Sequence, residues 1–154
     1  MLERLDLHHH FPTLRRVTST PRQGSERPAV IRLIGVYDTE GTIRGEVAYW
    51  VGARLGRRHC SLCDVTHGTF SEKTAWKRCR TALPVPFDTF HRDDRPDEIR
   101  FASGDRTPVV LAETTAGMVL LLIGSQIDDA QGDPERLIAA IESAVSEAGL
   151  AWPE

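Results

Sequence analysis

Two cysteines and a histidine, Cys60, Cys63 and His67, lie within eight residues in the segment "HCSLCDVTHG". A redox dithiol needs two sulfurs within disulfide reach, one of them with a lowered pKa. The basic residues 57–59 directly upstream favour a thiolate. The first hypothesis is therefore thiol exchange, with Cys60 as the more exposed nucleophile, Cys63 as the resolving thiol and His67 nearby. It requires a turn between the cysteines, because a straight strand points residues three positions apart to opposite faces.

The same residues also fit two other interpretations. Cys60, Cys63 and His67 have the spacing C-x2-C-x3-H, and Cys79 on the next predicted helix could complete a tetrahedral zinc or copper site. Alternatively, the cysteines are small buried apolar residues. Cys79 fits this third interpretation in part, since it shares an apolar helix face with Trp76. The sequence leaves exchange, metal binding and simple burial open.

The cysteines must be positioned by alternating strands and helices. A run rich in Val and Ile indicates a buried first strand, and Asp133 followed by Pro134 is a typical helix start. The predicted elements are a strand at 29–38, a helix at 42–56, a weak strand at 62–66, a helix at 71–83, strands at 109–113 and 118–123, and a helix at 134–148. The charged connection at 84–106 is expected to hold short extended pieces around Phe87–His91 and Ile99–Phe101.

This β-α-β-α-β-β-α order predicts an α/β fold. Two strands joined by a helix should be parallel, and two strands joined by a tight turn should be antiparallel. We therefore expect a mixed four-stranded sheet with helices on both faces.

Composition indicates one globular domain preceded by an arm. The chain has 154 residues, 40% of them hydrophobic and 27% charged. Residues 1–28 contain a segment dense in Ser, Thr, Pro and charge, which predicts a flexible arm before a domain at 29–154. The net charge of −3 argues against nucleic acid as the main partner, which leaves an unknown protein or small molecule. No apolar run is long enough to span a bilayer, and the first residues lack a secretory signal, so we expect a cytoplasmic location.

The element order and the dipeptide Thr107-Pro108 resemble the thioredoxin-like superfamily over residues 29–149. The resemblance implies a cis proline facing the active site and a C-x-x-C motif directly after the first strand. That slot reads Thr39-Glu40-Gly41-Thr42 here and holds no thiol, so the cysteine pair is expected one helix later. The expected function is an atypical thioredoxin-like protein that uses a displaced C-x-x-C. The alternative is a zinc-binding, copper-binding or partner-binding accessory protein without catalysis.

The predicted topology also brings polar residues to one edge of the sheet, where open α/β sheets bind ligands. An acid, a histidine and an arginine gathered there could serve as a general acid/base or anion site, although loops are also polar simply because they face water. Three segments are expected to contribute: Asp38, Thr39 and Glu40; His67 and Gly68; and Arg106, Thr107 and Pro108.

Overall fold

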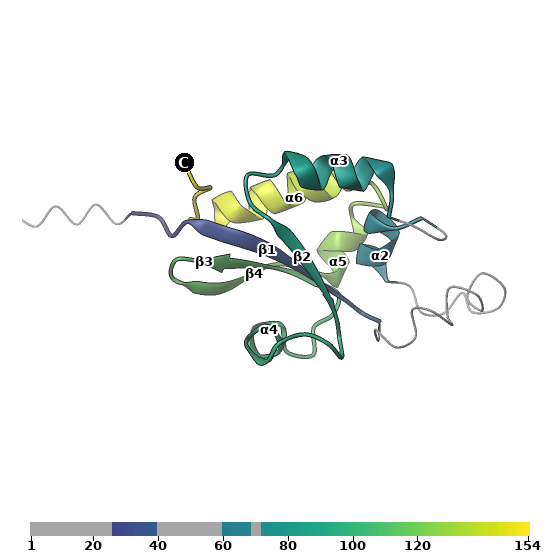
Figure 1. Ribbon diagram of the computed structural model, residues 1–154, viewed down its shortest axis with the longest axis horizontal. Helices are drawn as coiled ribbons and strands as arrows, with labels where there is room; N and C mark the ends of the chain where they lie inside the picture. Colours follow the sequence, from purple (N-terminus) through teal and green to yellow (C-terminus); the bar gives the residue numbers. More distant parts are fainter. Residues whose placement is uncertain (1–25, 40–59, 69–71) are drawn as a thin grey trace, which may run out of the picture.

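A mixed four-stranded sheet forms the centre of the computed structural model, which describes residues 26–39, 60–68 and 72–154 (Figure 1). The strands lie in the order β2-β1-β3-β4. β1 runs parallel to β2, and the pairs β1–β3 and β3–β4 are antiparallel. The predicted C-terminal hairpin is therefore confirmed, and β1 has a parallel neighbour, but that neighbour is Phe87–His91 and not the predicted strand at 62–66. The strands are β1 (Val30–Tyr37), β2 (Phe87–His91), β3 (Val109–Thr114) and β4 (Gly117–Ile123).

Helices cover both faces of this sheet. The helices are α2 (Ser61–Thr66), α3 (Thr74–Ala82), α4 (Asp97–Ser103), α5 (Gly124–Asp128) and α6 (Pro134–Glu147). Figure 1 shows α3 and α6 on one face and α4 on the other. The larger apolar core lies under α2, α3, α5 and α6, and a smaller one lies beneath α4. α6 begins as predicted, since the Asp133 carboxylate accepts a hydrogen bond from the backbone N–H of Glu135 at 2.9 Å.

The predicted strand at 62–66 is wrong, because this segment is helix α2. Leu62, Val65 and Thr66 are all buried, and their spacing of three and four residues places them on one helical face. A six-residue segment with so few apolar positions fits both periodicities, which explains the error.

The second strand of the sheet is instead Phe87–His91, which the sequence indicated only as a short extended piece. The extended piece expected around Ile99–Phe101 is also wrong, since these residues belong to α4. Ile99 is fully buried in the smaller core, while Asp97 and Glu98 occupy the first helical turn, where acidic side chains are favourable.

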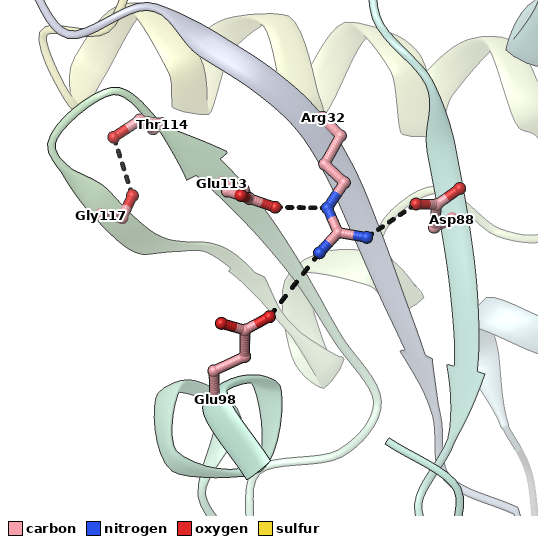
Figure 2. Close-up of polar contacts among 6 residues, drawn as sticks. All are labelled: Arg32, Asp88, Glu98, Glu113, Thr114 and Gly117. Carbon is pink, nitrogen blue, oxygen red and sulfur yellow. Dashed lines mark hydrogen bonds and ion pairs between the residues drawn. The ribbon is translucent and has the colours of Figure 1, made fainter. Parts of the chain in front are cut away.

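An arginine at the surface joins three strands and α4 (Figure 2). Arg32 on β1 pairs with Glu113 on β3, with Asp88 on β2 at 3.0 Å and with Glu98 on α4 at 3.9 Å. Hydrogen bonds to Glu113 and Asp88 raise the pKa of the Arg32 guanidinium. The ion pair with Glu98 links α4 to the sheet near the start of β1.

The two ends of the domain meet beside β1. The Pro28 carbonyl accepts a hydrogen bond from the Ala151 N–H at 2.9 Å, and the Val30 N–H donates to the Ala151 carbonyl at 2.8 Å. Residues 1–25 of the predicted arm and the predicted helix at 42–56 lie outside the described residues. In the described ranges, no helix is both long and apolar enough to cross a membrane.

Candidate functional site

The two clustered cysteines form a disulfide at the first turn of α2. Cys60 is the N-cap residue and Cys63 lies in the first turn, with their Cα atoms 5.2 Å apart. The Cys60 Sγ accepts a hydrogen bond from the Cys63 backbone N–H at 3.4 Å. The helical turn supplies the bend that a dithiol requires. The pair therefore lies at the start of a helix, in the connection from β1 to β2, and not on a strand.

The exposure of the two cysteines is opposite to the prediction. Cys60 is only 6% exposed and belongs to the larger core, whereas Cys63 is half-buried. The physical reason is the position of α2, which places its N-cap against the sheet. The expectation that Cys60 is the more exposed sulfur is therefore wrong.

A glycine in β1 lets α2 approach the sheet closely. Leu62, between the two cysteines, is fully buried, and Phe87 of β2 lies beside it. A Cβ atom at Gly35 would lie 3.0 Å from Leu62 Cδ2 and 2.9 Å from Phe87 Cε1. Only glycine leaves room for both side chains, so Gly35 sets the depth at which the cysteine pair lies.

His67 ends α2 and is held by a short hydrogen-bond network. Its backbone N–H donates to the Cys63 carbonyl at 2.8 Å, and its Nδ1 lies 2.7 Å from Thr66 Oγ1. The Thr66 hydroxyl donates its one proton to the Leu62 carbonyl at 3.0 Å. Its lone pairs therefore accept from the His67 Nδ1–H and from the Tyr37 hydroxyl, which lies 3.0 Å away. This network fixes the orientation of the His67 ring.

Two aromatic contacts extend this network to β2. The Tyr37 ring lies 5.8 Å from the ring of His67 and 5.5 Å from that of His91. The His91 Nδ1 lies 3.0 Å from an Asp94 carboxylate oxygen, and the other carboxylate oxygen accepts from the His91 backbone N–H at 2.6 Å. Tyr37 and His91 are register partners at the ends of β1 and β2. His91 was not predicted as a site residue, because its segment was expected to be a short extended piece of a charged connection and not a strand of the sheet.

A cleft of about 450 Å³ lies beside α2. Lys73 connects its walls, because the Lys73 Nζ donates to the Asp64 carbonyl and, at 2.9 Å, to the Gly132 carbonyl. This role of Lys73 could not be predicted from its residue type, since its partners are backbone carbonyls, one of them 59 residues away in the chain. The lining residues are Ser61, Asp64, His67, Lys73, Ile127, Asp128, Gln131 and Gly132.

The predicted edge of the sheet forms in part. The Thr107 hydroxyl donates to the Asp38 carboxylate at 2.7 Å, and the Thr107-Pro108 peptide bond is cis, as the resemblance implied. Arg92 also pairs with Asp38, at 3.5 Å. The expected participation of Glu40 lies outside the described residues.

The proposed fourth metal ligand, Cys79, lies elsewhere. It is a free, half-buried thiol on α3, and burial together with the charge of Glu135 at the start of α6 raises its pKa. In the part of the chain that the structure describes, no three His, Cys, Asp or Glu side chains gather closely enough to hold a metal ion. The geometry thus brings Cys60 and Cys63 together and does not add His67 and Cys79 to them as a ligand set.

No family profile, curated protein or solved structure matches this chain. Its function must therefore be inferred from the cysteine pair and its surroundings.

Proposed function

We propose that this chain carries out thiol–disulfide exchange through Cys60 and Cys63, as an atypical member of the thioredoxin-like superfamily. The observation that carries the proposal is the disulfide between these two residues at the first turn of a helix. Exchange begins when a substrate thiolate attacks one sulfur and expels the other as a thiolate, which gives a mixed disulfide. A second substrate thiolate then releases the oxidised substrate and leaves the protein pair reduced.

Three features support the thioredoxin-like assignment. A helical connection joins the parallel strands β1 and β2, and β3 and β4 follow as an antiparallel hairpin beside β1. The Thr107-Pro108 bond directly before β3 is cis. The C-x-x-C motif begins a helix of the connection between the first two strands. A fold of this kind hosts many activities, so the activity itself rests on the cysteine pair.

The surroundings of Cys60 favour a reducible pair over an inert one. The thiolate formed at Cys60 on reduction can keep the hydrogen bond that its sulfur already accepts from the Cys63 N–H. Hydrogen bonds to a charged group favour the charged form, so this donor supports reduction of the pair.

The test is a redox titration of the full chain against glutathione or dithiothreitol buffers, read by mass shift after thiol alkylation. We expect a midpoint within the range of exchange proteins, about −120 to −270 mV. The Cys79→Ser variant is the matched control and should have the same midpoint. A pair that stays oxidised well below about −300 mV would instead be a structural disulfide. Stoichiometric zinc or copper bound to freshly purified protein would favour the metal-binding alternative.

A further inference from the structure

We infer that substrate thiols exchange at Cys63, so that the mixed disulfide forms on the second cysteine of the motif and Cys60 is the leaving and resolving sulfur. This inference rests on the proposed exchange function and specifies its chemistry. Two independent features of the pair, access and leaving-group stabilisation, lead to the same order.

The first feature is access. A thiolate attacks a disulfide along the sulfur–sulfur axis, from the side opposite the leaving sulfur. Cys60 is only 6% exposed and belongs to the larger core. Cys63 packs against the same core but is half-buried, so it is the more exposed residue of the pair. An incoming thiolate therefore has better access to Cys63.

The second feature is the stabilisation of the leaving group. The Cys60 Sγ accepts the backbone N–H of Cys63 at 3.4 Å, so the charge released onto Cys60 meets a donor already in place. Attack at Cys63 expels this stabilised sulfur, whereas attack at Cys60 would expel Cys63 and add an incoming group within the core.

The exchange balances as two displacements. A substrate thiolate bonds to Cys63 Sγ, the Cys63–Cys60 bond breaks, and its electron pair leaves on Cys60 Sγ. A second thiol of the same substrate then attacks the substrate sulfur of the mixed disulfide and releases Cys63 as a thiolate. The substrate dithiol is oxidised to a disulfide, and the protein pair is reduced. In the reverse direction Cys63 attacks a substrate disulfide and Cys60 closes the protein disulfide.

A trapping experiment on the intact cysteine pair tests this order. The oxidised full chain, carrying Cys79→Ser to remove the third thiol, is mixed with excess reduced glutathione and quenched with acid after short times. Free thiols are then blocked, and peptide mapping locates the glutathione. We expect the adduct on Cys63 and a blocked free thiol on Cys60. Neither paired cysteine is substituted, so this result does not depend on the folding of a Cys60 or Cys63 variant.

Single-cysteine variants give a second, independent measurement. In the same background, reduced Cys60→Ser keeps only Cys63 and reduced Cys63→Ser keeps only Cys60. We expect the Cys60→Ser variant to react with oxidised glutathione about tenfold faster than the Cys63→Ser variant, because limited access slows the reaction of a buried thiol. The reaction is followed by intact mass, and circular dichroism compares the folding of the two variants.

The outcomes separate the two proposals. An adduct on Cys60, or a Cys63→Ser variant that reacts as fast as Cys60→Ser, overturns the order of attack and leaves the exchange function standing. A pair that forms no adduct at either position and is not reduced by glutathione or dithiothreitol overturns the exchange function itself.

Discussion

Replacing Gly35 by alanine should introduce a steric clash with Leu62, the residue between the two cysteines, and with Phe87. The added Cβ would lie 2.9 Å from Phe87 Cε1 and 3.0 Å from Leu62 Cδ2. Carbon atoms prefer separations of about 3.5–4.0 Å, so both side chains would have to move back by about 0.5–1 Å. Both are buried, Leu62 completely and Phe87 at 4% exposure, and Phe87 also packs against the Trp76 ring with centroids 4.9 Å apart. The displacement therefore spreads into the larger core.

The size of the effect follows from opposing contributions. Overpacking a well-packed core costs about 1–3 kcal/mol. Alanine in a strand recovers about 0.5–1 kcal/mol, because glycine loses more conformational freedom on folding. We expect Gly35→Ala to lower the free energy of unfolding by about 1–2 kcal/mol. For a chain of this length, that corresponds to a fall in Tm of about 2–8 °C.

Urea denaturation of the oxidised protein, followed by circular dichroism, measures this loss. Gly124→Ala is the matched control, since a Cβ there would lie 3.4 Å from its nearest neighbour, Pro108 Cδ, which is an ordinary contact. It should leave stability unchanged or raise it by up to about 1 kcal/mol. If Gly35→Ala unfolds at the same urea concentration as the wild type, with an unchanged m-value, then α2 does not lie as close to β1 as the structure shows.

Three further changes probe the surroundings of the site. Thr66→Val removes a buried hydroxyl that holds Tyr37, and should cost about 1–3 kcal/mol in urea denaturation, while Thr66→Ser keeps the hydroxyl and should cost less. Lys73→Met removes two hydrogen bonds to backbone carbonyls across the cleft and should lower Tm, whereas Lys77→Met, at an exposed position of α3, which Lys73 precedes, should change Tm little. Burial raises the pKa of the Cys79 thiol, so its iodoacetamide alkylation, measured with both paired cysteines replaced by serine, should need a higher pH in the folded than in the urea-unfolded protein. By linkage, the protonated thiol stabilises the fold below its unfolded pKa, and this contribution is lost as the pH rises through the folded pKa. Equal alkylation profiles in the two states would contradict the burial of Cys79.

The elements with strong local patterns could be predicted from the sequence. β1, β3 and β4 are apolar runs of strand length, and α6 begins with a capping aspartate before a proline. Each pattern is complete within its own segment, so no distant contact is needed to interpret it. The antiparallel pairing of β3 with β4 then followed from the tight turn between them.

The elements that were predicted incorrectly depend on contacts with residues distant in the sequence. α2 has six residues, too few to separate helical from strand periodicity. β2 is an outer strand of the sheet and carries Asp88 and Thr89, so its composition resembles that of a loop. Only its pairing with β1 identifies it as a strand. The prediction of which cysteine is more exposed was wrong for the same reason, because the burial of Cys60 arises from its packing in the larger core.

The edge of the sheet could nevertheless be predicted in part, because it depends on strand direction and not on which segment supplies the second strand. β1 and β2 run parallel, so Tyr37 and His91 must end at the same edge. β3 runs antiparallel to β1, so Thr107, two residues before the start of β3, lies at that edge, where its hydroxyl donates to the Asp38 carboxylate. The end of α2 joins them through the hydrogen bond from Tyr37 to Thr66. Strand direction alone therefore brings these chain ends together, whereas the position of the disulfide depends on the packing of α2 on β1, where Leu62 lies against Gly35.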